Sequence, residues 1–181
     1  GLHAAQKRGE IANGLLHVAR VFAIDAASLA QANNLTLRSM LHVGQQLHVP
    51  GRLERINTLL TTTAQAVGVD PKLVRAVAWM ESGWQQNVTS RTGAIGIMQI
   101  EPYTAQRIST YLVGRTLDVH TAPDNVYAGA VLLKHLLSAH NGDIDAALAA
   151  YYQGDLSITE HGLFTDTRQY QKVVTTLIGR E

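Results

Sequence analysis

The sequence contains no cysteine among its 181 residues. A disulfide framework, a thiolate nucleophile and a cysteine-ligated metal are therefore excluded. An H-E-x-x-H pattern is also absent, and His135 and His140 are spaced wrongly for one face of a helix. We therefore expect neither a metal site nor another cofactor.

An excess of charge of one sign is missing as well. The 15 Lys and Arg residues nearly balance the 14 Asp and Glu residues, which gives a net charge of +1, and no basic run occurs. Because nucleic-acid binding depends on a basic surface, a nucleic-acid partner is not expected. A nearly neutral chain is compatible with a largely uncharged ligand such as a carbohydrate.

The sequence has no long hydrophobic run. No stretch of about 18 apolar residues occurs, and no charged segment leads into an apolar stretch at its start. We therefore expect no membrane span and no signal peptide within this sequence; the signal of an exported protein would lie outside it. The hydrophobic content of 46% is typical of a globular protein, which we expect to be a monomer.

Residues 1–51 differ in character from the rest of the chain. The apolar spacing predicts helices at 15–21 and 26–32, and the alternation at 46–49 before Pro50 is typical of a short strand. The pattern predicts a small α+β module in this part.

Residues 52–181 read as a mainly α domain. Asp70 offers an N-cap oxygen and Pro71 a preferred first-turn residue, so a helix is predicted from there toward Glu81. The glycines between 82 and 96 predict a loop. Apolar residues three or four positions apart predict further helices at 53–67, 102–112, 123–139, 144–152 and 167–178.

Glu81 is the strongest candidate for chemistry. On a helix it lies on the same stripe as Val74 and Val77, which should be buried. Burial and the negative end of the helix dipole both disfavour a carboxylate, so its pKa should be raised. Such a carboxyl can remain protonated near neutral pH and act as a general acid. The alternative is an exposed glutamate at a helix end, which is the common case.

Three motifs occur in order after this helix begins. They are Glu81–Trp84 (ESGW), Gly93–Ile100 (GAIGIMQI) and Ala150–Gly154 (AYYQG). This set resembles the soluble lytic transglycosylase family of the lysozyme superfamily, which carries an E-S, a G-L-M-Q and an A-Y-N-x-G motif in this order. The resemblance covers about residues 53–178. It implies a lysozyme-like, goose-type helical domain with a deep cleft that acts on peptidoglycan.

The resemblance also implies roles for single residues. Glu81 would be the catalytic acid and base, Ser90 would lie near an N-acetyl group, and Gln99 would line the cleft beside Met98. Gly93 and Gly96 would let the backbone approach a ligand closely, although an ordinary turn is the alternative. The residues expected to bind substrate are Ser90, Met98, Gln99, Tyr151, Tyr152, Asp166 and Tyr170.

Tyrosines form the other part of the implied site. By resemblance, Tyr151 would hold Glu81 through a hydrogen bond, and Asp166 and Tyr170 resemble the acidic and aromatic positions of the family's E-T-R-x-Y pattern. Core packing is the alternative for Tyr151 or Tyr152.

Three positions depart from the family pattern. Tyr152 stands where the family has asparagine, Glu101 where it often has an apolar residue, and Leu132 where a cleft tyrosine is expected. These departures affect contacts with the sugars more than the reaction, because none of them removes the acid.

The implied reaction uses one carboxyl group. Glu81 would protonate the β-1,4 bond between N-acetylmuramic acid and N-acetylglucosamine, then accept the proton of the muramoyl 6-hydroxyl as that oxygen attacks C1. The product is a 1,6-anhydro sugar. Hydrolysis would need a second carboxylate, for which the candidates are Glu101, Asp155, Glu160 and Asp166. A hydrolytic muramidase and a wall-binding protein without activity remain the alternatives.

The N-terminal part resembles a LysM module in three segments, Val18–Phe22, Ser28–Asn33 and Val43–Pro50. The start around Lys7–Glu10 is followed by a longer stretch than is usual for that family. LysM modules bind glycans that contain N-acetylglucosamine, which would hold cell wall near the catalytic domain. A subdomain that only docks on the rest is the alternative. The resemblance implies action in the bacterial envelope, outside the cell, or in a phage virion.

Overall fold

The computed structural model describes residues 14–42 and 44–180. All regular structure within these ranges is helical, and the β contacts are two isolated bridges that join Ile95 to Thr89 and to Ile100. The prediction of a mainly α protein is therefore confirmed. The elements are α2 (Gly14–Val21), α3 (Ala26–Ala32), α4 (Arg52–Val67), α5 (Pro71–Ser82), α6 (Pro102–Arg107), the π-helix η1 (Ile108–Val113), α7 (Ala122–Ala139), α8 (Ile144–Gln153), α9 (Asp155–His161) and α10 (Thr165–Ile178).

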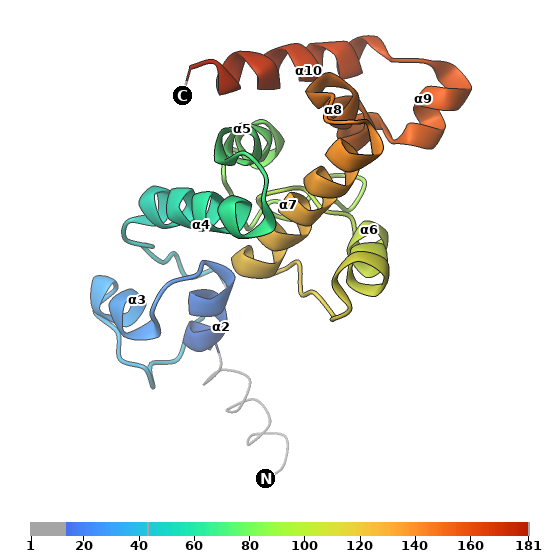
Figure 1. The fold of residues 1–181 in the computed structure, drawn as a ribbon. Helices are drawn as coiled ribbons and strands as arrows, with labels where there is room; N and C mark the ends of the chain where they lie inside the picture. Colours follow the sequence, from blue (N-terminus) through green and yellow to red (C-terminus); the bar gives the residue numbers. More distant parts are fainter. Residues whose placement is uncertain (1–13, 43, 181) are drawn as a thin grey trace.

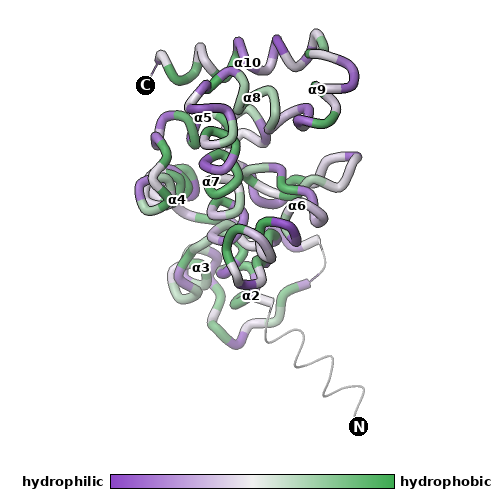
Figure 2. The backbone as a smooth tube through the Cα atoms, turned by 45° about the vertical axis from the view of Figure 1, so that its right-hand side comes forward, coloured by the Kyte–Doolittle hydropathy of each residue, from purple (hydrophilic) through white to green (hydrophobic). Residues whose placement is uncertain are grey.

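Helix α7 lies at the centre of the larger hydrophobic core, to which it contributes several fully buried side chains. It lies between α4 and α6 (Figure 1), packs against α4, α5 and α8, and is coloured as hydrophobic along much of its length in Figure 2. Its middle carries the buried small residues Ala128, Gly129 and Ala130. Because these leave room on every side, neighbouring elements can approach α7 closely. Helix α10 packs across α5 and α8.

The ends of α4 and α5 follow from local sequence. Gly68 ends α4 in the left-handed conformation, with φ of 82°. The Asp70 side chain accepts a hydrogen bond from the Lys72 N–H, and Pro71 occupies the first turn, as predicted. Gly83, with φ of 59°, ends α5 just after Glu81 and Ser82. Helix α5 therefore begins and ends at defined positions, and it ends just after the candidate acid.

Two helix predictions were incomplete. The segment predicted as one helix at 102–112 is α-helical only to Arg107 and continues as the π-helix η1, in which the Gly114 N–H donates to Ser109 O at 2.8 Å. Helix α9 was not predicted, because its seven residues carry no buried side chain and so no apolar stripe.

The strand predicted at 46–49 is wrong. Both backbone groups of His48 are bonded by the Asn33 side chain instead: the His48 N–H donates to Asn33 Oδ1 at 2.7 Å, and Asn33 Nδ2 donates to His48 O at 2.8 Å. Since a side-chain amide satisfies these groups, this segment needs no strand partner. The described part of residues 1–51 is therefore helical and irregular, not α+β; Lys7–Glu10 and Val43 lie outside the described residues.

The N-terminal part has a small apolar cluster of its own, around Leu15 and Leu29. It meets the large domain where α2 packs on α7, and Arg20 forms a 3.1 Å ion pair with Asp118 there. Both side chains of that pair are well exposed, so it adds little stability. Among the described helices none is by itself long and apolar enough to cross a membrane, while α2 and α3 reach that length only as a pair bent by 106°.

Candidate active site

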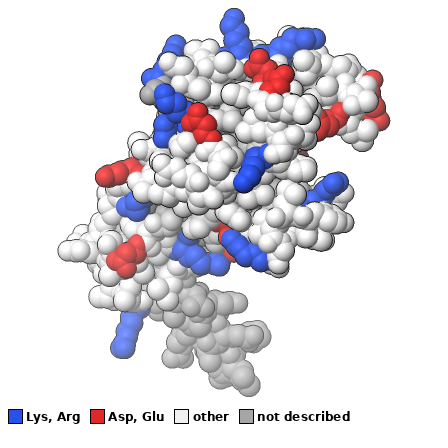
Figure 3. Space-filling view, in the orientation of Figure 1, with Lys and Arg blue, Asp and Glu red and all other residues white. Residues whose placement is uncertain are grey.

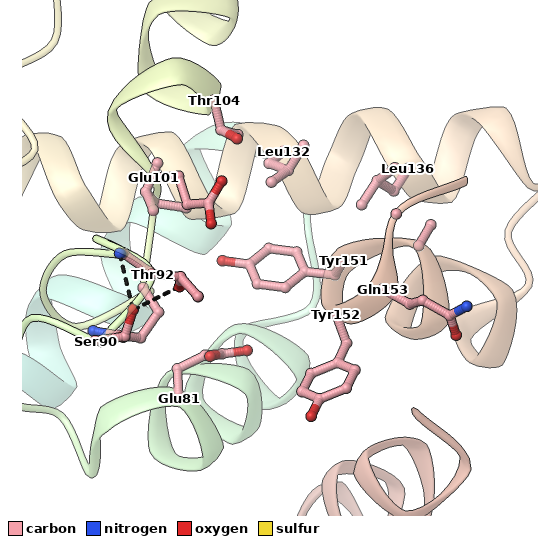
Figure 4. Close-up of a pocket in the computed structure, with 15 residues that line it drawn as sticks. Glu81, Ser90, Thr92, Glu101, Thr104, Leu132, Leu136, Tyr151, Tyr152 and Gln153 are labelled. Carbon is pink, nitrogen blue, oxygen red and sulfur yellow. Dashed lines mark hydrogen bonds between the residues drawn. The ribbon is translucent and has the colours of Figure 1, made fainter. Parts of the chain in front are cut away.

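A cleft of about 510 Å³ opens between α5, α7, α8 and the segment from residue 90 to 104. Figure 4 shows Glu81 on one side, Glu101 and Thr104 on another, and Tyr151 between them. Of the predicted substrate-binding residues, Ser90, Gln99, Tyr151 and Tyr152 line this cleft together with Glu81. Met98, Asp166 and Tyr170 do not.

Glu81 projects into the cleft from the last turn of α5. Val74 and Val77, on the same stripe, are completely buried. Burial raises the pKa of the Glu81 carboxyl above its usual value, and a hydrogen bond from Tyr170 lowers it in part. The net shift of the Glu81 pKa is upward, so the site disfavours the ionised form relative to an ordinary glutamate.

Tyr170, on α10, holds Glu81. Its hydroxyl donates to Glu81 Oε1 at 2.6 Å, and its ring stacks on that of Tyr152 with 4.6 Å between centroids. Burial, followed by the nearby Glu81 charge, raises the pKa of Tyr170 well above its usual value. Tyr170 therefore keeps its proton over a wider pH range than an ordinary tyrosine does, and it donates that proton to the bond with Glu81.

Tyr151 has a different partner from the one expected. Its hydroxyl donates to the Met98 carbonyl oxygen at 2.7 Å, while Tyr170 makes the bond to Glu81. Burial and the Glu81 charge raise the pKa of Tyr151 as well. The prediction for Tyr151 was wrong because sequence order does not tell which of two nearby tyrosines reaches the acid. The Tyr152 hydroxyl donates to neither of these groups; it donates to Asp166 Oδ2 at 3.3 Å.

Met98 does not contact the cleft with its side chain. It is completely buried against Gly129 of α7, where an added Cβ would lie 2.6 Å from Met98 atoms. The Met98 carbonyl oxygen accepts the hydrogen bond from the Tyr151 hydroxyl, and this backbone contact is what connects Met98 to the site. Packing therefore explains Met98 better than substrate contact does.

The turn from Ile95 to Ile100 is anchored to two helices. Ser82, beside Glu81 on α5, donates from its hydroxyl to Ile97 O at 2.9 Å. Asn125, on α7, is completely buried; its Oδ1 accepts from the Met98 N–H at 2.8 Å, and its Nδ2 donates to Ile95 O and Val119 O. These bonds fix one wall of the cleft relative to the acid.

Gly96 is required for packing within this turn. Its φ is 74°, and a Cβ there would lie 2.5 Å from the Gln86 side chain and 2.7 Å from Asn125 Nδ2. The close approach predicted for Gly96 is therefore to these side chains and not to a ligand. A Cβ on Gly93 would meet nothing within 4 Å.

Gln99 and Ser90 present polar groups to the cleft. Gln99 has a positive φ of 48°, an uncommon conformation for its type, and its Nε2 donates to Gly96 O at 2.9 Å. That bond uses the amide nitrogen of Gln99, a residue that lines the cleft. Ser90 Oγ accepts from the Ala94 N–H at 3.0 Å and pairs with Thr92 Oγ1 at 2.9 Å (Figure 4).

Glu101 is the second carboxylate that lines the cleft, and Leu132 lines it as well. The other candidates are engaged elsewhere: Asp155 pairs with His140 at 2.9 Å and Asp166 accepts from Tyr152. Glu160 is exposed on α9. Among the described residues lining the cleft there is no Lys, Arg or His, and no cluster in the described part of the chain is arranged to hold a metal.

Sequence reasoning missed Asn125 and Gln86 as positioning residues. Both are buried, and Gln86 Nε2 donates to Val119 O at 3.0 Å. A signal for Asn125 was available, because it interrupts the apolar face of 123–139 and a buried asparagine needs several partners.

Known proteins share this architecture and part of this sequence. The family model described as transglycosylase SLT domain matches residues 59–174. The transglycosylase of Enterobacteria phage PRD1 is 35% identical over 104 residues, which cover 58% of this chain and 36% of that protein. Membrane-bound lytic murein transglycosylase F of Marinobacter nauticus is 32% identical over 102 residues, covering 56% of this chain and 18% of that protein.

A solved structure extends the comparison. An inactive mutant of the lytic transglycosylase Slt from Pseudomonas aeruginosa superposes with a TM-score of 0.60 at 25% identity, covering 93% of this chain and 28% of that one. The chain thus spans about a third of the phage relative and a smaller share of the other two.

Proposed function

The chain belongs to the SLT transglycosylase domain family, and from that premise we propose that it is a peptidoglycan lytic transglycosylase with Glu81 as its single acid and base. One observation carries the proposal. The Glu81 carboxyl lines the cleft, its pKa is raised by burial, and it is held by the 2.6 Å bond from Tyr170. A protonated carboxyl in such a position is what cleavage of a glycosidic bond needs.

In the proposed reaction, Glu81 donates its proton to the bridging oxygen between N-acetylmuramic acid and N-acetylglucosamine. Positive charge develops at C1 of the muramoyl residue as the bond breaks. The Glu81 carboxylate then accepts the proton of the 6-hydroxyl while that oxygen bonds to C1. Every proton is returned and no water is consumed, so the product ends in a 1,6-anhydro ring.

The surrounding residues act in this proposal by binding and positioning. Tyr170 holds the Glu81 carboxyl, and Tyr151 fixes the turn at Met98. Ser90 and Gln99 offer hydrogen bonds to acetamido and hydroxyl groups, which suits their place in the cleft wall. On the face in Figure 3, acidic and basic side chains lie interspersed among many uncharged ones, which suits a mostly uncharged glycan.

The decisive experiment digests purified sacculi with the wild-type protein and with Glu81→Gln. We expect 1,6-anhydro muropeptides from the wild type and a rate lower by about 10²- to 10⁴-fold from the variant, the usual contribution of a general acid. Products heavier by one water would identify a muramidase. Equal clearing by both proteins would show that Glu81 is not the acid, and clearing by neither would favour a wall-binding protein.

We also propose that residues 1–51 and 52–181 are separate units. The apolar cluster around Leu15 and Leu29 is distinct from the core of the large domain, which supports this division. Glycan binding by the N-terminal unit remains a proposal supported by its sequence resemblance to LysM. Action in the cell envelope or in a phage particle is supported by the kinds of relative that the chain resembles, which include phage and membrane-bound bacterial proteins.

A further inference from the structure

A second hollow adjoins the cleft on the far side of Leu132. It is lined by Tyr103, Arg107, Tyr111, Leu112, Leu132 and His135, a set that we call the α6 groove, and it encloses about 370 Å³. Thr104 and Leu132 line both this groove and the catalytic cleft. In Figure 4 these two residues lie at the edge of the cleft that is remote from Glu81. The two hollows therefore adjoin each other at this edge.

The α6 groove carries large hydrophobic side chains, two of them aromatic, that are unusually exposed. Tyr103 is 67% exposed, Tyr111 is 76% exposed and Leu112 is 41% exposed. Tyr103 and Tyr111 also line a neighbouring hollow of about 290 Å³ together with Arg107. The Arg107 guanidinium lies 5.9 Å from the centre of the Tyr103 ring, which restrains that ring. Exposed apolar groups gathered in one hollow are a mark of a binding surface.

The backbone beneath these side chains is itself unusual. Tyr111 and Leu112 belong to the π-helix η1, which begins where α6 ends. A π-helix is rare, and such segments are found frequently at functional sites. The wider turn changes the direction in which side chains project, and here it leaves both Tyr111 and Leu112 exposed beside α6.

From these observations we infer that the α6 groove is an additional subsite for sugar residues of the same glycan strand. The cleft of about 510 Å³ lies within the roughly 300–1,000 Å³ range of sites for small ligands, so a long strand must extend beyond it. The groove adjoins the cleft at Thr104 and Leu132, so a strand that leaves the cleft over these two residues would reach it. The C–H faces of sugar rings pack well on exposed aromatic rings, and Tyr103 and Tyr111 supply two of them.

This inference rests on the proposed function for the identity of its ligand, and it is tested by binding. Peptide-free glycan strands and a tetrasaccharide are titrated calorimetrically into Glu81→Gln protein, which should not cut them, with and without Tyr103→Ala/Tyr111→Ala. We expect the tyrosine changes to weaken binding of long strands by roughly tenfold, the scale on which aromatic anchors act, and to leave the tetrasaccharide unchanged. Tyr103→Phe/Tyr111→Phe keeps the rings and should bind like the parent.

Two controls separate the outcomes. Leu156→Ala removes another highly exposed apolar side chain, 72% exposed on α9, and should change nothing. Thermal melting checks that the tyrosine variants fold. Equal binding of long strands by parent and Ala variant, or equal losses in the Phe and Ala variants, would overturn the inference. So would a dimer formed by the parent and lost in the Ala variant, since the groove would then join two copies of the chain.

The wild-type digestion separates this inference from the proposed function. If the wild type cleaves sacculi and the groove changes do not affect strand binding, the inference alone fails. If the wild type does not cleave but strand binding depends on both tyrosines, the inference stands and the catalytic proposal fails.

Discussion

The hydroxyl of Tyr170 donates a 2.6 Å hydrogen bond to Oε1 of Glu81, which joins the last turn of α5 to α10. Two effects act on the carboxyl in opposite directions. Burial raises its pKa, and the bond lowers it because the bond favours the ionised form. Since burial is the larger effect, the pKa of the Glu81 carboxyl lies above that of an ordinary glutamate.

Removing that bond with Tyr170→Phe should raise the pKa of Glu81 further. If protonated Glu81 starts the reaction, kcat/KM falls as pH rises through this pKa, so the alkaline limb of the pH profile should move to higher pH. Tyr152→Phe is the control, because it keeps the bond between Tyr170 and Glu81. An alkaline limb that stays in place or moves down in Tyr170→Phe would show that the bond does not tune the acid.

Glu81→Gln should stabilise the fold at neutral pH. A carboxyl whose pKa is higher in the folded chain binds more protons when folded, so the free energy of unfolding falls as pH rises from the usual glutamate pKa of 4.5 through the pKa of the folded chain. Above that pH range the variant should be more stable than the wild type by about 0.5–2 kcal/mol. Gains of this size are common when a substitution removes an active-site residue that lowers the stability of the fold. The gain should vanish well below pH 4.5.

Melting temperatures measured across this pH range test the stability prediction. Glu160→Gln, at an exposed carboxylate on α9, serves as the control and should show a small difference at every pH. A Glu81→Gln gain that is the same in acid and at neutral pH would mean that the effect does not come from ionisation.

Asn125→Leu should destabilise the protein by about 1–3 kcal/mol. The change leaves the buried Met98 N–H without its acceptor, which costs about that much, while Ile95 O keeps the bond from the Ile100 N–H and Val119 O keeps the bond from Gln86. Urea unfolding measures the effect, and Asn57→Leu on the exposed face of α4 is the matched control. A cost similar to that of the control would mean that the turn does not depend on Asn125.

The helices of the large domain were predictable because their signals are local. Asp70 and Pro71 begin α5, Gly68 ends α4, and the apolar stripe that contains Val74 and Val77 already placed Glu81 next to the core. These features depend on residues a few positions apart, for which propensity and periodicity are informative.

The side-chain contacts that complete the site could not be predicted from local sequence patterns. The partner of Glu81 lies 89 residues away on α10, and the choice between Tyr151 and Tyr170 depends on how α8 and α10 pack. The same holds for Asn33, whose amide replaces a strand partner for His48. Long-range pairing of side chains is set by tertiary packing, which local patterns do not encode.

Glu101→Gln tests whether the second carboxylate of the cleft takes part in the reaction. Glu101 lines the same cleft as Glu81, and hydrolysis by the usual routes needs two carboxyl groups about 5–9.5 Å apart. If Glu101 activates water, its loss should lower kcat/KM by about 10²- to 10⁴-fold and remove products that carry an added water. If Glu81 acts alone, the variant should stay within about tenfold of the wild type and release the same 1,6-anhydro products.

We expect the second result, because the 6-hydroxyl of the muramoyl residue supplies the nucleophile and Glu81 can accept its proton. Mass spectrometry of the digested wall, with kcat/KM measured on the same substrate, separates the two cases. Glu101→Leu provides a further comparison, since it restores the apolar character of this position in the family and removes the charge entirely. A large loss in both variants together with hydrated products in the wild type would assign the protein to hydrolysis and Glu101 to the chemistry.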